Sequence, residues 1–381
     1  MKFFLKSAVL ILISAIIIYF MSKNNLLQIS SLKIAFVKNP KILYLIFFLQ
    51  IFSCILMTLR YFSILKIFDI HVDFKNVTAA TFVSNGLGLW LPGSMAFIEI
   101  IRIGLMLGAE NKVLLNTQTQ IEEKNLNKNP VTNNKEQLSL RSRLTTVSLF
   151  DRLIGLWCML FVGLCVLGYH LLFSFQKITN SYQHIGIISI FIFTFLLLIF
   201  ITFLPYFSKN IITRKIVTHI ERLFLTFFRR GLLHKLFKKI FFEIGAIFDA
   251  IAIGGKKLNK FFLPSAYSFL CVFIQAISVY YAALAISSFI PFSAILATIS
   301  IVAVATLVPM GFGGIGGVQF VAAISMSFFG VIPHSAASAQ LLQTAINLLS
   351  ISFAGIFFSK ITSKQIKSML KIYQIKNLNK N

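Results

Sequence analysis

Acidic residues are scarce in this chain of 381 residues, and so are charged residues of any kind. Aspartate and glutamate number 11 against 36 lysines and arginines, and all four types together make up 12% of the sequence. The hydrophobic share is 57%, and the mean hydropathy is +0.85. This composition excludes a soluble globular domain. It predicts a single polytopic membrane domain over 1–381 and an all-α integral membrane fold.

The sequence also lacks the usual signatures of metal sites, disulfide frameworks and enzymes. Each of its four cysteines lies in an apolar run, without a CxxC pair or a histidine at ligand spacing. This pattern is typical of packing residues and not of zinc ligands or disulfides. No Walker A, HExxH or GxSxG motif occurs, and the six histidines are scattered. We therefore expect no catalytic residue, no metal, no cofactor and no enzymatic activity.

The excess of basic residues, a net charge of +25, is concentrated in a few polar segments. A nucleic-acid partner would require a folded basic domain with a recognisable motif, and none is present. Basic loops beside membrane spans are instead typical of a cytoplasmic face near anionic lipid. Three cytoplasmic segments are predicted: a flexible polar loop over 109–143, a basic amphipathic segment over 209–260 and a basic tail over 360–381.

Long apolar runs predict six plain membrane spans. They are Ser7–Met21, Ile42–Tyr61, Leu144–Phe173, Ile185–Phe207, Phe261–Ile290 and Ala336–Phe358. With the basic segments in the cytoplasm, the N-terminus is cytoplasmic as well. This scheme leaves four lysines between 23 and 41 outside, against the positive-inside rule.

Two further apolar runs are interrupted by proline and glycine. In Phe292–Phe329 the stretch TLVPMGFGGIGGVQ occupies the middle, and in Val77–Leu107 the stretch NGLGLWLPGS does. Proline and glycine break helices, and an interrupted span in each half of a chain is a pointer to a transporter's binding site. The two runs predict broken hairpins that re-enter the membrane or form half-spans, arranged as an inverted repeat. The alternative is that the glycines only allow close helix packing.

Candidate binding residues come from these interruptions and from charges inside the apolar runs. Glu99 and Arg102 share a helix face at i and i+3, whereas the neighbours Asp151 and Arg152 point about 100° apart and need different partners. We expect Arg102 or Arg60 to bind Asp151. The full set of predicted substrate-binding residues is Arg60, Pro92, Gly93, Ser94, Glu99, Arg102, Asp151, Arg152, Pro309, Gly311, Gly313, Gly314, Gly316, Gly317 and Gln319.

The stretch Gly311–Gly316 matches the G-x-G-x-x-G dinucleotide fingerprint by letter. The fingerprint requires a preceding strand and an acidic residue about 20 positions later. Neither is present in this apolar setting, so we reject a nucleotide site.

Three motifs together resemble the lysylphosphatidylglycerol synthase transmembrane region family. They are LPGS at Leu91–Ser94 followed by Glu99 and Arg102, FDRLIGL at Phe150–Leu156, and VPMGFGGIGGVQ at Val308–Gln319 before a short loop and a final span. The likeness extends over about Ser7–Phe358. It departs from the family at Ala96 and Phe97, where a glycine pair is usual, at Ser63, where arginine is common, and at Gln319, where glutamate is common.

The resemblance implies a flippase-like protein of the bacterial cytoplasmic (inner) membrane, of the kind found alone or fused to synthases of the multiple peptide resistance factor type. It implies movement of an anionic phospholipid or a polyprenyl-linked glycolipid, with membrane lipids as partners. The alternative is a non-transporting subunit that docks a glycosyltransferase or lipid-modifying enzyme through the basic segment. A third reading, transport of a small soluble anion, predicts a closed central cavity.

Overall fold

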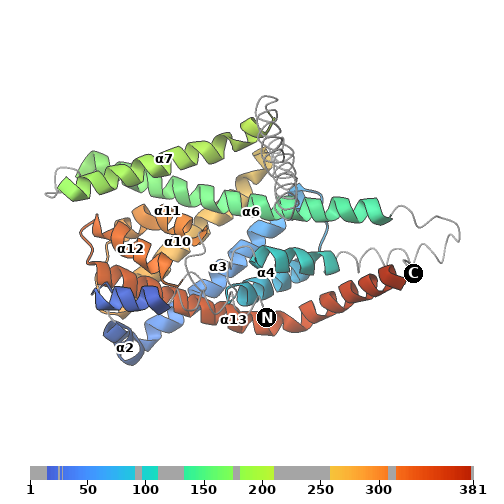
Figure 1. Ribbon diagram of the computed structural model, residues 1–381, viewed down its shortest axis with the longest axis horizontal. Helices are drawn as coiled ribbons and strands as arrows, with labels where there is room; N and C mark the ends of the chain where they lie inside the picture. Colours follow the sequence, from blue (N-terminus) through green and yellow to red (C-terminus); the bar gives the residue numbers. More distant parts are fainter. Residues whose placement is uncertain are drawn as a thin grey trace, which may run out of the picture.

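A computed structural model describes residues 15–24, 26–27, 29–90, 97–109, 133–174, 181–209, 258–307 and 315–378. These residues form helices and short connections without a strand, as the predicted all-α fold requires (Figure 1). Besides helices at 15–23 and 97–109, the α-helices are α2 (Ile29–Lys38), α3 (Pro40–Ile67), α4 (Phe74–Gly88), α6 (Asn133–Tyr169), α7 (Ser181–Lys209), α10 (Phe262–Ala285), α11 (Phe292–Leu307), α12 (Gly317–Ser327) and α13 (Pro333–Leu378).

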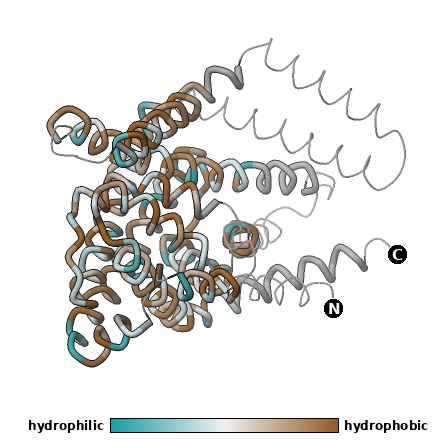
Figure 2. Tube along the Cα trace, turned by 60° about the vertical axis from the view of Figure 1, so that its left-hand side comes forward, coloured by the Kyte–Doolittle hydropathy of each residue, from teal (hydrophilic) through white to brown (hydrophobic). Residues whose placement is uncertain are grey.

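Five of the described helical segments are long and apolar enough to cross a membrane, and they correspond to five of the six predicted spans. They are Pro40–Ile67, Arg143–Phe173, Tyr182–Phe203, Asn259–Ala285 and Pro333–Ser363. Hydrophobic residues dominate along these helices (Figure 2). The remaining predicted span, 7–21, is the first in the chain and lies mostly outside the described residues. The chain is therefore a multi-pass membrane protein.

Several helix boundaries differ from the prediction; α3, for example, ends at Ile67 instead of Tyr61. α6 begins at Asn133, inside the predicted 109–143 loop, and α13 continues to Leu378 through most of the predicted tail. Both extensions are rich in leucine, lysine and glutamine, which favour helix even in polar sequence. α10 ends at Ala285 instead of residue 290, because Ser287 adopts a left-handed φ of 57° that stops the helix. The predicted basic segment lies outside the described residues from 210 to 257.

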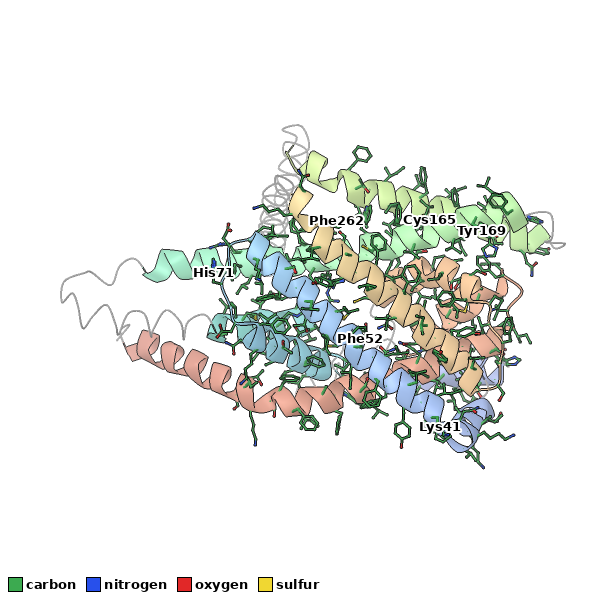
Figure 3. The ribbon with its side chains drawn as sticks, turned by 180° about the vertical axis from the view of Figure 1, so that it is seen from behind. Lys41, Phe52, His71, Cys165, Tyr169 and Phe262 are labelled. Carbon is green, nitrogen blue, oxygen red and sulfur yellow. The ribbon has the colours of Figure 1, made fainter. Side chains whose placement is uncertain are left out.

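The two ends of the bundle can be distinguished by contacts between connecting segments. At one end, the Arg143 guanidinium donates to the carbonyl oxygens of Phe68 and Asp69, joining the start of the α6 span to the end of α3. At the other end, Asn39 Nδ2 donates to the Ala285 carbonyl at 2.9 Å. Figure 3 shows Lys41 and Tyr169 toward this second end and His71 toward the first.

Both interrupted runs are broken helices that are too short to cross. α4 has 15 residues, α11 has 16 and α12 has 11, so each is at most about 24 Å long against a hydrocarbon core of about 30 Å. α4 starts at the first end of the bundle, while α11 starts and α12 finishes at the second. One hairpin thus enters from each end, as an inverted arrangement requires (Figure 1).

The two broken elements approach each other near the middle of α13. Trp90, just after α4, donates from Nε1 to Ser352 Oγ at 2.7 Å, and Gln319 of α12 donates from Nε2 to Thr344 Oγ1 at 3.3 Å. Thr344 and Ser352 are eight residues apart, about 12 Å along a helix, and lie equally far from the middle of the span Pro333–Ser363. α13 therefore supports both hairpins at the depth where each helix breaks.

Glycines permit the close packing that holds the first hairpin together. A Cβ added at Gly88 would lie 2.9 Å from the backbone nitrogen and Cα of Ile98, so the helix 97–109 passes directly over the end of α4. A Cβ added at Gly86 would lie 3.2 Å from the Ile351 carbonyl oxygen of α13. Close packing, the alternative reading of the glycines, thus applies to these two positions.

We expect Gly88→Ala to separate the two halves of the first hairpin and destabilise the protein. The methyl group would meet backbone atoms that cannot rotate away, and such overpacking costs about 1–3 kcal/mol. Gly104→Ala is the matched control, because a Cβ there has no neighbour within 4 Å. Alanine favours helix by up to about 1 kcal/mol over glycine. Thermal unfolding in detergent should show a lower midpoint for the first variant only; equal midpoints would contradict the close contact.

Candidate functional site

Five charged side chains from three helices meet inside the bundle, near its first end. Arg60 Nε lies 2.6 Å from Asp151 Oδ1, and Arg102 Nη1 lies 3.3 Å from Asp151 Oδ2. Glu99 Oε1 lies 3.7 Å from Arg102 Nη1 and 2.6 Å from Arg152 Nη2. We call these five residues the charge cluster. Asp151 binds both arginines considered as its partners, and Arg152 has a different partner, as predicted.

Arg60 is held by α10 as well as by Asp151. Its Nη1 donates to Ser268 Oγ at 3.2 Å, and the side chain is 5% exposed. Gly155, one turn after Asp151, leaves the space that the guanidinium fills, since a Cβ there would lie 2.9 Å from Nη1. The glycine of the FDRLIGL motif therefore has a packing role beside the arginine.

Arg102 lies between its acidic partners and an aromatic ring. Its guanidinium carbon is 4.7 Å from the ring centroid of Tyr61, a distance at which a cation is attracted to the ring face. The Tyr61 hydroxyl is 3.3 Å from Ser148 Oγ, which fixes the ring against α6. Tyr61 and Ser148 were not predicted as site residues. Tyr61 directly follows Arg60, and Ser148 precedes Asp151 by three residues. These positions next to charged residues were the signal in the sequence that could have identified them.

The charge cluster is buried at one side and partly open at the other. The side chains of Arg102 and Asp151 are 4% and 2% exposed, whereas those of Glu99 and Arg152 are 17% and 26% exposed. Arg102 Nε and Glu99 Oε2 are buried atoms without a hydrogen-bond partner in the described part of the chain. One donor, on the buried Arg102, and one acceptor, on the partly exposed Glu99, are thus not used by the described residues.

Three arginines and two carboxylates give the cluster a formal net charge of +1. Arg60 is seven residues from the end of α3, so the cluster lies about 10 Å inside the span. A net charge at such depth is costly unless a counter-ion or water balances it. The cluster therefore has the charge and the open donors to hold one anionic group.

The proline and glycine candidates divide into two groups. Pro92, Gly93, Ser94, Pro309, Gly311, Gly313 and Gly314 lie outside the described residues, so their predicted role in binding stays a prediction. Gly316 and Gly317 open α12, and Gly316 has a left-handed φ of 101°. The Gly316 amide donates to Gln319 Oε1 at 2.6 Å. Gln319 thus caps α12, and it does not contact the charge cluster.

Sequence reasoning missed a set of buried glutamines in the middle of the bundle. Gln275 Nε2 donates to Gln50 Oε1 at 3.1 Å, and Gln343 Nε2 donates to Gln275 Oε1 at 2.8 Å. Each glutamine interrupts an apolar run, and that isolation was the signal that could have identified them.

An open apolar groove of about 440 Å³ lies between α6 and α7. Its lining includes Leu164, Gly168 and Phe191. Leu164 is 13 residues after Asp151, about 20 Å along α6, so the groove is remote from the charge cluster. It has the form of a lipid-facing surface and no charged lining residue.

Helices of membrane length, shorter apolar helices and a buried charge cluster define a polytopic membrane protein with an internal polar site. The sequence pattern of one family, the lysylphosphatidylglycerol synthase TM region, matches residues 131–355. The chain belongs to this family, a lipid-related and flippase-like kind of membrane protein. The match is shorter than the resemblance over 7–358: it includes Asp151, Arg152 and the second hairpin but not Arg60, Glu99 or Arg102. No curated protein and no solved structure matches the chain.

Proposed function

We propose that the protein moves an anionic lipid, a phospholipid or a polyprenyl-linked glycolipid, between the leaflets of a bacterial cytoplasmic membrane. The phosphate of the headgroup binds the charge cluster while the acyl chains remain in the surrounding lipid. In this proposal the protein is a carrier and not an enzyme. Glu99 and Asp151 position the arginines and are not themselves phosphate ligands.

The observation that carries the proposal is the net positive charge of the buried cluster. Asp151 is shared by Arg60 and Arg102, and Glu99 is shared by Arg102 and Arg152, so three guanidinium groups have two carboxylates between them. Arginine binds phosphate through several parallel N–H donors. A phosphate would neutralise the excess charge and accept from Arg102 Nε, which has no hydrogen-bond partner among the described residues.

The inverted hairpins support the same proposal. Transporters built from inverted repeats place their sites near broken helices, and here each hairpin begins at its own end of the bundle and reaches the middle of α13. Such symmetry allows one arrangement open to each leaflet. Family membership supports a lipid as the substrate in preference to a soluble anion.

We expect Arg152→Gln to abolish most lipid transfer without unfolding the protein. Arg152 is at the open side of the charge cluster, and its loss would reduce the formal charge from +1 to zero. Losing one charge-assisted contact to phosphate costs about 1.5–3 kcal/mol, which corresponds to roughly 10- to 100-fold slower transfer. The measurement is dithionite quenching of tail-labelled phosphatidylglycerol in proteoliposomes that contain the full chain.

Lys33→Gln is the matched control, because it removes one exposed positive charge at the other end of the bundle. It should transfer lipid at the wild-type rate. Equal rates for wild type, Arg152→Gln and empty vesicles would reject lipid transfer. That result, together with capture of an envelope-synthesis enzyme by 209–260, would favour the docking function instead.

A further inference from the structure

Three buried glutamines and the half-buried Gln275 form a continuous hydrogen-bonded chain across three helices. Gln340 Nε2 donates to Gln343 Oε1 at 3.3 Å, and Gln343 Nε2 donates to Gln275 Oε1 at 2.8 Å. Gln275 Nε2 in turn donates to Gln50 Oε1 and to Ser53 Oγ, both at 3.1 Å. We call Gln50, Gln275, Gln340 and Gln343 the amide chain. It joins α3, α10 and α13 without a charged residue.

At one end the amide chain reaches the second hairpin. Thr344 Oγ1 donates to the Gln340 carbonyl at 2.7 Å and accepts from Gln319 Nε2 at 3.3 Å. Gln319 Oε1 accepts from the Gly316 amide, the first residue before α12. The break in the second hairpin is therefore connected through hydrogen bonds to the centre of the bundle.

At its other end the amide chain approaches the charge cluster along α10. Ser268, which binds Arg60, is seven residues before Gln275, so the two share a helix face about 10 Å apart. Cys271 lies between them on that face, and its thiol contacts the Ser53 carbonyl at 3.7 Å. A line of polar groups thus leads from the charge cluster of the first end to the break of the second hairpin.

Two buried amide atoms, one in the amide chain and one next to it on α13, have no hydrogen-bond partner among the described residues. Gln50 is 0% exposed, and its Nε2 has no partner among the described residues. Asn347, one turn after Gln343, likewise has a buried Oδ1 without a partner. An unmet amide at the middle of a membrane span is unfavourable. The vacant atom of Gln50 is a donor and that of Asn347 is an acceptor, and a hydroxyl group can bind to either kind.

We propose that the amide chain is a second, uncharged headgroup site, which binds the hydroxyl groups of a polyol or glycosyl headgroup on its way between the leaflets. This inference rests on the proposed function and specifies its substrate class. Neutral hydrogen bonds are about half as strong as charge-assisted ones, so a headgroup leaving the arginines is held here without being trapped. Conduction through a membrane protein needs intermediate sites of this moderate strength.

The test compares two lipids of equal charge, of which one carries headgroup hydroxyl groups and the other does not. Phosphatidylglycerol and phosphatidylmethanol carry the same phosphodiester charge, and both receive the same tail fluorophore. Transfer is measured in proteoliposomes for the wild type, Gln50→Leu and Asn347→Leu. Gln50→Leu removes the vacant donor, while Gln275 keeps its bonds to Ser53 and Gln343. We expect about tenfold slower transfer of phosphatidylglycerol, the effect of one lost hydrogen bond, and less than twofold change for phosphatidylmethanol.

Ser278→Ala is the matched control, because this buried α10 hydroxyl donates only within its own helix, to the Ile274 carbonyl at 2.8 Å. It should leave both rates unchanged. Equal slowing of the two lipids by both variants, or no slowing of either, would overturn the second site while the proposed function stands. Absence of transfer of both lipids by the wild type would instead overturn the proposed function, and the second site with it. If Gln50→Leu does not fold, the Asn347→Leu rates decide.

Discussion

Asp151→Asn is expected to leave little folded protein, the largest loss of stability that we predict for any single substitution. Asp151 is 2% exposed and is the shared partner of Arg60 and Arg102. Its neutralisation would raise the formal charge of the cluster from +1 to +2 at a depth where water does not compensate. Breaking a buried ion pair by removing one partner costs about 3–5 kcal/mol, and here one substitution weakens two pairs.

Fluorescence-detected size exclusion and thermal unfolding in detergent measure this effect. Asp73→Asn is the control, since Asp73 is exposed before α4 and its side chain makes no cap hydrogen bond. It should elute and melt as the wild type does. A monodisperse Asp151→Asn protein with an unchanged midpoint would show that the buried charges are balanced by something other than Asp151.

A double variant that removes an arginine together with Asp151 tests the same electrostatic argument, because it leaves neither partner of that ion pair. In Arg60→Met/Asp151→Leu the oppositely charged partners disappear together, and methionine and leucine fill much of the same volume. Replacing a whole buried pair is often close to neutral, whereas removing one partner is not. The double variant should therefore recover part of the stability that Asp151→Asn loses.

The charge cluster could be predicted from sequence because ionisable residues inside apolar runs are rare and must find partners. The i and i+3 spacing of Glu99 and Arg102 indicated their contact, and the adjacency of Asp151 and Arg152 indicated separate partners. Membrane burial makes this reasoning strong, since an unpaired charge has few alternatives.

The amide chain could not be assembled from sequence in the same way. Glutamine is uncharged and has both donors and acceptors, so it does not specify which partner it needs. Gln50 and Gln275 are 225 positions apart, and only the packing of α3 against α10 brings them together. Gln319 shows the same limit: its position after the glycine run indicated binding, but its amide is used to cap α12.

Helix ends were the least predictable part of the fold. The break at position 92 was expected from proline and glycine, and α4 does end before it, at Gly88, while position 309 lies outside the described residues. The length of each half depends on how the hairpin packs. α12 is limited to 11 residues by its cap at one end and by the turn after Ser327 at the other. Periodicity within an apolar run carries no information about those contacts.

The polar groups beside the two hairpins differ in charge. Beside the first hairpin are charges, of which Glu99 and Arg102 belong to its own second half. The second hairpin is joined to neutral amides through Gln319. A glutamate at position 319 would add a negative charge at that end. Because position 319 is glutamine, the charge cluster alone determines the net charge of the polar groups that lead from it through the amide chain to the second hairpin.

Arg152→Glu should abolish the transfer of anionic lipid, the largest functional effect that we predict. It changes the formal charge of the cluster from +1 to −1, so the site would repel phosphate. At about 5 Å and an effective dielectric constant of about 20, one unit charge contributes roughly 3 kcal/mol, so a reversal slows transfer by at least about 100-fold. The pair is partly exposed, at 17% for Glu99 and 26% for Arg152, so folding should tolerate the change.

Exchanging Glu99 and Arg152 tests whether lipid transfer depends on the net charge of the charge cluster or on which residue occupies each position. In Glu99→Arg/Arg152→Glu the ion pair is reversed, and the formal charge returns to +1. Since Glu99 and Arg152 lie 2.6 Å apart, the reversed pair can form at the same place. We expect phosphatidylglycerol transfer within about tenfold of wild type, because Arg60 and Arg102 remain and the cluster again attracts an anion. If the exchanged protein folds but transfers no more lipid than Arg152→Glu, then Arg152 acts through its position and not through the charge of the cluster.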